Sequence, residues 1–272
     1  MGVVNVTPDS FSDGGRFADV DAAVAHGLAM VADGADLVDI GGESTRPGAT
    51  RPLVQEELDR VIPVISELAG HGALVSVDTM RSEVAAAALA AGAALVNDVS
   101  GGLADPDILR TTADAGAAYV AMHWRGHSDV MQQRASYDAT TGGVARAVRY
   151  ELAERVEAAL ASGIGADRLA VDPGLGFAKT AEHNWQLLQR LDVIDELGLP
   201  ILVGSSRKSF LGSLLADDAG RPRPVLDRED ANVALTTLAG LAGVWGVRVH
   251  EARASVDALK VVSRWQRTTG DA

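Results

Sequence analysis

Residues 74–99 read LVSVDTMRSEVAAAALAAGAALVNDV and contain one complete strand–helix–strand unit. The runs at 74–78 and 94–99 are short and apolar, which is typical of strands buried on both faces of a parallel sheet. Between them, residues 82–91 are rich in alanine, the residue with the highest helix propensity. We therefore predict two parallel strands joined by a helix.

The same alternation continues along the whole chain. Eight apolar runs are predicted strands: 2–6, 37–40, 74–78, 94–99, 119–123, 169–172, 201–205 and 247–250. Helix-like stretches follow them at 19–34, 54–69, 82–91, 105–115, 144–162, 181–191, 207–215, 230–242 and 252–267. Eight strand–helix units without a hairpin signal or linker predict a single-domain (β/α)8 TIM barrel over residues 1–272. An open doubly wound sheet is the alternative, and the lack of a G-x-G-x-x-G motif after the first strand disfavours it.

Local signals place several ends of these elements. Asp19 and Ser82 are candidate N-caps. Glycines suited to helix termination follow four predicted helices: Gly34, Gly92, Gly116 and Gly163. Residues 216–230 are rich in Gly, Pro and Asp, so we predict an exposed excursion between the last two strands.

Composition excludes several classes of protein. The 272 residues include 24 Lys and Arg against 37 Asp and Glu, a net charge of −13, which argues against non-specific nucleic-acid binding. The chain has no cysteine, which excludes disulfides and thiol catalysis. No apolar run reaches about 18 residues and no signal peptide is recognisable, so we expect no membrane span and a cytoplasmic protein.

Polar residues collect at the carboxyl ends of the predicted strands, where barrel enzymes place their chemistry. The set comprises Asn5, Asp39, Glu43, Asp78, Asn97, Asp98, His123, Asp172, Ser205 to Lys208, Arg248 and His250. Burying an unpaired polar group costs about 1–3 kcal/mol, so a set of this size predicts a binding site.

The residue types indicate what this site binds. Asp78, Asn97 and Asp172 supply two carboxylates and an amide, which suit the hydrogen-bonding edge of a nitrogen heterocycle. Positive charge and donors come from Lys208, Arg248 and His250. Arg248 and His250 are two residues apart on a strand and so share a face, where they suit a phosphate or diphosphate.

Other signals are weaker. The loops 6–15 and 41–49 are long and polar, which makes them lid candidates. His123 and His127 are four residues apart, but they follow a strand and lack a third ligand, so we do not predict a zinc site. No G-x-S-x-G motif indicates a nucleophilic serine.

Seven motifs together resemble the dihydropteroate synthase family. They are MGVVNVTPDSFSDGG (1–15), DIGGESTRPGA (39–49), SVDTMR (76–81), NDVSGG (97–102), DPGLGFAKT (172–180), GSSRKSFLG (204–212) and VRVHEARASVDALKV (247–261). The resemblance covers essentially the whole chain in the order of the family. Residues 123–136 match no role in it.

The resemblance implies an enzyme that joins 6-hydroxymethyl-7,8-dihydropterin diphosphate to p-aminobenzoate, with Mg2+ as cofactor, and that releases pyrophosphate. The implied pterin site is Asp78, Asn97, Asp172 and Lys208. The implied diphosphate site is Asn5, Thr45, Arg248 and His250, with Asn5 also on the metal. The implied p-aminobenzoate pocket is Phe11, Pro47, Phe177, Ser206 and Lys208. The candidate catalytic residues are Asp78, Lys208 and Asp13, although Asp13 has the alternative role of capping its own turn.

The resemblance also implies a homodimer and binding of sulfonamides as mimics of p-aminobenzoate. No nucleic-acid or membrane partner is expected. Two other functions stay open from the sequence: a non-catalytic pterin-binding paralogue, and a methyltransferase that passes a methyl group from a reduced folate to a corrinoid protein. The methyltransferase would need Asp78, Asn97 and Asp172 but not the diphosphate-binding residues.

Overall fold

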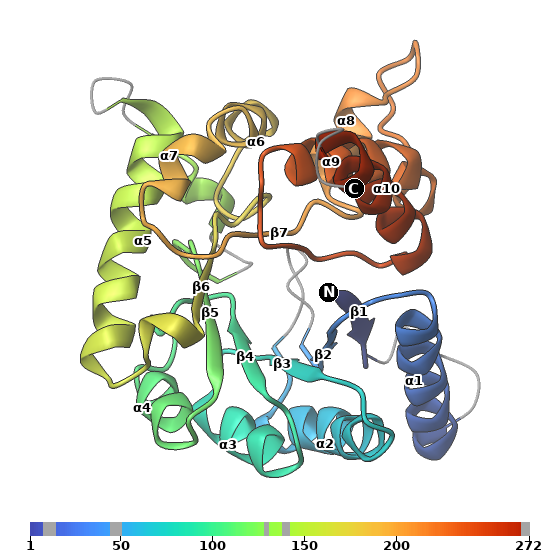
Figure 1. The fold of residues 1–272 in the computed structure, drawn as a ribbon, viewed down its shortest axis with the longest axis vertical. Coiled ribbons are helices and arrows are strands. Elements are labelled where there is room, and N and C mark those ends of the chain that lie inside the picture. The colour runs from blue at the N-terminus through green and yellow to red at the C-terminus, as the bar shows by residue number, and fades with distance from the viewer. Residues whose placement is uncertain (8–14, 44–50, 128–130, 138–141, 268–272) are drawn as a thin grey trace.

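The computed structural model describes residues 1–7, 15–43, 51–127, 131–137 and 142–267 (Figure 1). The strands are β1 (Gly2–Asn5), β2 (Val38–Gly41), β3 (Val75–Asp78), β4 (Leu95–Asp98), β5 (Ala118–Met122), β6 (Leu169–Asp172), β7 (Leu202–Val203) and β8 (Gly246–Val247). The helices are α1 (Gly15–Ala32), α2 (Val54–Gly70), α3 (Ser82–Ala90), α4 (Asp107–Asp114), α5 (Gly143–Ala161), α6 (Ala181–Leu188), α7 (Leu191–Asp195), α8 (Ser209–Leu214), α9 (Glu229–Leu241) and α10 (Ala252–Gln266). Short 3-10 turns cover Met131–Arg134, Ala166–Arg168 and Val225–Arg228.

The strands form a closed ring. Strands β1 to β6 pair in sequence order, all parallel, and β7 pairs in parallel with β8. Two isolated parallel bridges join these groups: Val171 to Ile201 between β6 and β7, and Gly2 to Val249 between β1 and the end of β8. The ring confirms the barrel, and the helices lie outside the strands (Figure 1).

The register brings the carboxyl ends of neighbouring strands to one level. Asn5 pairs with Gly41, Gly41 with Asp78, and Asp78 with Asn97. Side chains at these positions therefore stand around one end of the barrel.

Helix α2 shows how the outer layer is held. It buries Val61, Val64, Ile65 and Leu68, whose three- and four-residue spacing places them on one stripe. These side chains pack with outward-facing strand residues in the largest apolar cluster of the described chain.

Three predictions about element ends are wrong. The stretch 181–191 is not one helix, because Arg190 has non-helical angles (φ −128°, ψ 39°) and separates α6 from α7. Asp19 lies inside α1 instead of capping it. Ser82 is the first helical residue of α3, and its N–H donates to the Asp105 carboxylate at 2.7 Å, so Asp105 does the work of a cap.

Other local predictions are confirmed. The four glycines expected after helices all have positive φ, between +64° and +112°. The excursion 216–230 is exposed up to residue 227, but Arg228 is buried. Within the described residues, none of the helices combines the length and apolar composition needed to cross a bilayer.

Candidate active site

The polar site stands on an apolar layer inside the barrel. This layer consists of Leu37, Leu95, Val120, Ala170 and Leu202. Two residues after members of the layer come Asp39, Asn97 and Asp172. Because alternate strand residues point to the same face, these polar side chains also point inward, one level nearer the carboxyl ends of the strands.

Asp39 is the central acceptor of the site. Its fully buried carboxylate accepts hydrogen bonds from Ser76 Oγ at 2.6 Å, Asn97 Nδ2 at 2.9 Å and Arg248 Nε at 2.6 Å. The bond to Asn97 holds the amide nitrogen toward Asp39, so the Asn97 carbonyl oxygen faces away from it. The sequence placed Asp39 at a strand end but gave it no role.

Arg248 joins two carboxylates across the barrel. Its Nη2 donates to Asp78 Oδ2 at 2.7 Å, while its Nε binds Asp39. Burial raises the pKa of the Asp78 carboxyl to about 7, although Arg248 opposes this shift. A positively charged ligand beside Asp78 would favour its ionised form.

Asp172 and Lys208 stand together near the end of β6. Burial raises the pKa of Asp172, opposed by Lys208, and the Gly174 N–H donates to its carboxylate at 2.7 Å. Lys208 Nζ donates to the Leu175 carbonyl and lies 5.0 Å from the centre of the Phe177 ring. Burial lowers the pKa of Lys208 to about 8, against the effect of Asp172.

Ser206 and His250 form a pair on the loops after β7 and β8. Ser206 Oγ lies 2.9 Å from His250 Nδ1 and accepts from the His250 backbone N–H at 3.3 Å. The contact holds the His250 ring with Nδ1 toward Ser206, so its Nε2 lies on the side of the ring away from the serine.

Asn5 lies at the end of β1, beside Gly41 in the register. A Cβ atom on Gly41 would lie 3.7 Å from Asn5 Oδ1 and 3.6 Å from Asp78 Oδ2. The amide oxygen of Asn5 and a carboxylate oxygen of Asp78 thus both lie beside Gly41, and these are ligand types that Mg2+ prefers.

Nine of the predicted site residues lie in the described chain, at the carboxyl end of the barrel: Asn5, Asp78, Asn97, Asp172, Phe177, Ser206, Lys208, Arg248 and His250. The other four, Phe11, Asp13, Thr45 and Pro47, lie outside the described residues.

A second polar network lies behind the loop after β6. Lys179 Nζ is bonded to the carbonyls of Gly174 and Phe177 at 2.9 and 3.1 Å and to His123 Nδ1 at 2.9 Å. His123 Nε2 lies 3.0 Å from Glu151 Oε2, and burial lowers the pKa of His123 to about 4. Both ring nitrogens thus have protein partners, and in the described chain no three His, Cys, Asp or Glu side chains form a metal cluster.

The described part of residues 123–136, a segment without a predicted role, contributes to this network. Arg125 binds Glu151, donates to the carbonyls of Arg134 and Ser136, and lies 4.1 Å from the centre of the Tyr137 ring. Their sequence signal is His123 at the end of a predicted strand, although the sequence does not indicate its partner.

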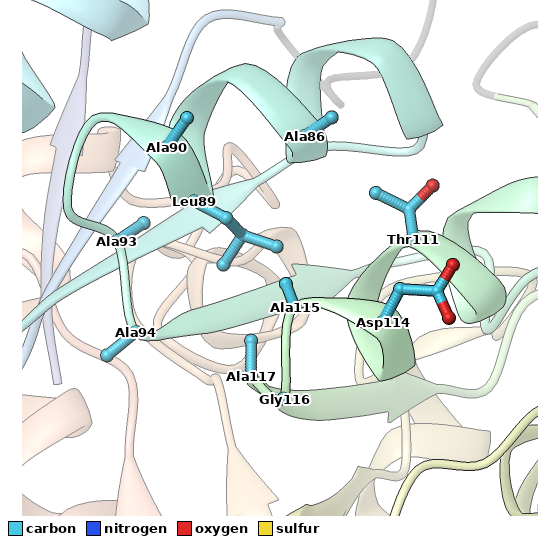
Figure 2. A pocket seen from close by; sticks show the side chains of 10 residues that line it. All are labelled: Ala86, Leu89, Ala90, Ala93, Ala94, Thr111, Asp114, Ala115, Gly116 and Ala117. Carbon is cyan, nitrogen blue, oxygen red and sulfur yellow. The ribbon is translucent and has the colours of Figure 1, made fainter.

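An apolar pocket of about 730 Å3 lies elsewhere, between α3 and α4 (Figure 2). Alanines dominate its lining, and it includes Ala94 and Ala117, which immediately precede β4 and β5. It is therefore at the amino ends of the strands, opposite the polar site. Its side chains offer only Thr111 and Asp114 as polar groups, so the chemistry is not here.

Comparisons with known proteins agree on one family. The profile of the pterin binding enzymes matches residues 1–250. Dihydropteroate synthase from Mycobacterium leprae (strain TN) is 54% identical over 266 residues, which are 97% of this chain and 92% of the relative. The Xanthomonas albilineans dihydropteroate synthase with 4-aminobenzoic acid has a TM-score of 0.89 and 47% identity, over 98% of this chain and 93% of that one. The Yersinia pestis dihydropteroate synthase with a sulfonamide drug complex has a TM-score of 0.88 and 39% identity over the same shares.

Proposed function

This chain belongs to the dihydropteroate synthases, a family of pterin-binding enzymes, and we propose how its residues carry out the transfer. It is a transferase of folate biosynthesis that condenses 6-hydroxymethyl-7,8-dihydropterin diphosphate with p-aminobenzoate. The observation that carries the residue assignment is the bridge from Arg248 to Asp39 and Asp78, beside Asn97. It places acceptors for a heterocycle next to a cation that suits a diphosphate.

The pterin is assigned to the side of the site that holds Asp172 and Asn97. The amino and ring N–H groups of a dihydropterin are donors, and buried carboxylate and amide oxygens are the acceptors they need. The carbonyl oxygen of Asn97, turned away from Asp39, supports this assignment. Lys208, which lies beside Asp172, would donate to the acceptors of the same ring.

The reaction breaks the bond between the pterin methylene carbon and the diphosphate oxygen, and the electron pair leaves with pyrophosphate. The dihydropterin ring donates electrons to the methylene carbon, which gives a cation-like transition state. Asp78 would stabilise this charge. Arg248 and His250 would stabilise the negative charge on the leaving pyrophosphate. The sequence has no cysteine and no G-x-S-x-G motif, which suits this path, because the enzyme need not form a covalent intermediate.

The p-aminobenzoate nitrogen then forms the new bond to the methylene carbon and releases one proton to solvent. An arylamine is a weak nucleophile, and a cationic electrophile explains why it reacts. Phe177 would contact the ring of p-aminobenzoate, and Ser206 and Lys208 would complete its pocket. Sulfonamides, which share the aryl amine, are expected to compete for this pocket, as the sulfonamide complex of the Yersinia pestis relative supports.

Mg2+ is the proposed cofactor, and Asn5 is its proposed protein ligand. Oxygens of Asn5 and Asp78 both lie beside Gly41, and oxygen ligands of these types are the ones that a hard cation prefers. When bound, the ion would neutralise charge on the diphosphate. Mg2+ often has only one or two protein ligands beside substrate phosphates, so a large acidic cluster is not required.

Turnover with both substrates tests the function and separates it from the alternatives. Purified protein with Mg2+, pterin diphosphate and p-aminobenzoate should release pyrophosphate and form 7,8-dihydropteroate in equal amounts. Asp172→Ala is the matched control and should be inactive while folded. Pterin binding without turnover would indicate a non-catalytic paralogue, and methyl transfer to a corrinoid protein would indicate the methyltransferase.

A homodimer is part of the proposal. Exposed apolar side chains occur on α9, on α10 and just before β8: Leu238, Leu241, Trp245, Val261 and Trp265. Helices α9 and α10 pack closely, since a Cβ on Gly240 would lie 2.8 Å from Leu259. These side chains therefore supply apolar surface for a second copy. Trp265→Glu should convert a dimer to a monomer in light scattering, and an unchanged mass would count against this surface.

A cytoplasmic location is also proposed. The chain contains no cysteine, so its folding does not depend on an oxidising compartment. Fractionation of cells that make the protein tests this, and recovery outside the cytoplasm would refute it.

A further inference from the structure

The turn after β7 holds a strained backbone at the candidate active site. Arg207 has φ +63° although it is not glycine, and its neighbours Ser206 and Lys208 are both proposed substrate contacts. A left-handed conformation at a residue with a side chain costs free energy and persists only where the surroundings hold it. The turn must therefore have specific supports.

Arg228, the residue directly before α9, and Asn232, in the first turn of α9, supply two such supports. Arg228 Nη1 donates to the carbonyl of Arg207 at 2.9 Å and to that of Lys208 at 3.3 Å. Ser205 Oγ donates to Asn232 Oδ1 at 2.8 Å. Arg228 is only 8% exposed and Asn232 is fully buried, so these bonds are shielded from water.

The Arg228 guanidinium occupies a fitted space. Its Nε donates to the Arg223 carbonyl at 2.9 Å, and the Arg223 N–H donates to the Gly212 carbonyl at 3.0 Å. A Cβ on Gly212 would lie 2.5 Å from Nη2 and 2.6 Å from Cζ. Glycine at 212 thus leaves room for the guanidinium against α8, and the planar group bridges the turn and the excursion at once.

We propose that Arg228 and Asn232 are positioning residues that hold the Ser205–Lys208 turn in the conformation that presents Ser206 and Lys208 to the substrates. This inference rests on the proposed function. Sequence patterns do not indicate this role, because Arg228 belongs to a stretch with the composition of an exposed excursion. Neither residue is among the proposed substrate contacts, and both bind the turn instead.

Steady-state kinetics of Arg228→Gln, Arg228→Lys and Asn232→Ala test the proposal. Arg221→Gln is the matched control, because Arg221 lies on the same excursion with an 81% exposed side chain. We expect Arg228→Gln to lower kcat/KM for p-aminobenzoate at least tenfold at a temperature far below its unfolding midpoint. Arg228→Lys should recover part of the loss, because an ammonium group can still donate to the two carbonyls. The control should stay within twofold of wild type.

Crystal structures of the variants provide a readout that does not depend on turnover. We expect φ of residue 207 to leave the left-handed region in Arg228→Gln. If that variant does not fold, Ser205→Ala removes the second support with a smaller change and should lower kcat/KM at least threefold. Folded variants with kcat/KM within twofold of wild type, or with φ of residue 207 still near +63°, would overturn the inference. An inactive wild type would instead refute the proposed function, and the φ of residue 207 would still decide this inference.

Discussion

Replacing Arg248 with methionine tests the central ion pairs of the site. Methionine keeps much of the volume of the side chain but removes the guanidinium. The change breaks the bonds to Asp39 Oδ2 and Asp78 Oδ2, at 2.6 and 2.7 Å. It leaves two carboxylates close together without their shared cation.

The burial of the three side chains sets the magnitude. Asp39 is fully buried, Asp78 has 12% of its side chain exposed, and Arg248 has 21%. Removing one partner of a buried ion pair costs about 3–5 kcal/mol. Because Arg248 is partly exposed, we expect a loss near the lower end, about 3 kcal/mol of unfolding free energy at pH 7.5. The control Arg207→Met breaks an ion pair to Glu251, whose side chain is 59% exposed, and should cost less than about 1 kcal/mol.

The loss should grow as the pH rises. In the wild type the pKa of Asp78 is raised to about 7 in the folded state. Binding this proton stabilises the folded state at lower pH, and this stabilisation is lost as the pH rises to about 7. Arg248 lowers this pKa, so the variant has a still higher value and continues to lose stability above pH 7. Near pH 6, where Asp78 is mostly protonated in both proteins, the difference between them should be smaller.

Urea unfolding at pH 6.0, 7.5 and 9.0, at one protein concentration, measures these differences. The reasoning fails if Arg248→Met costs no more than the Arg207→Met control at every pH. It also fails if the difference shrinks as the pH rises.

Three further outcomes are expected. Gly174→Ala should destabilise the fold by about 3 kcal/mol or more, because its Cβ would lie 2.3 Å from the His123 carbonyl oxygen. The control Gly198→Ala has a similar φ but lies in open space, so it should cost only about 1–2 kcal/mol in the same urea assay. Asp172→Ala should lose about 3–5 kcal/mol of pterin diphosphate binding while staying folded, and calorimetry showing an affinity within threefold of wild type would contradict its assignment. Asp39→Asn should lower kcat at least tenfold, about 1.4 kcal/mol, because Ser76, Asn97 and Arg248 would no longer be held by its carboxylate. Turnover within twofold of wild type would count against its central role.

Much of the architecture could be predicted because it depends on local patterns. Short apolar runs and alanine-rich stretches reflect the preferences of strands buried on both faces and of helices, and their alternation allows few topologies. Asp78, Asn97 and Asp172 could be assigned to one site for the same reason, since the carboxyl ends of parallel strands meet at one edge. Motif resemblance then supplied the proposed roles.

The pairing of these residues depends on the closed barrel. Arg248 and Asp39 are 209 residues apart, and only the bridge between the first and last strands brings them within hydrogen-bonding distance. The same holds for Arg228, which follows an exposed stretch (216–227) while its guanidinium is buried against the turn after β7. Composition and periodicity describe what a residue prefers locally, whereas a hydrogen bond depends on distance and direction in space. The sequence therefore determined the barrel and the edge that carries the chemistry, and the tertiary structure decided which side chains hold one another there.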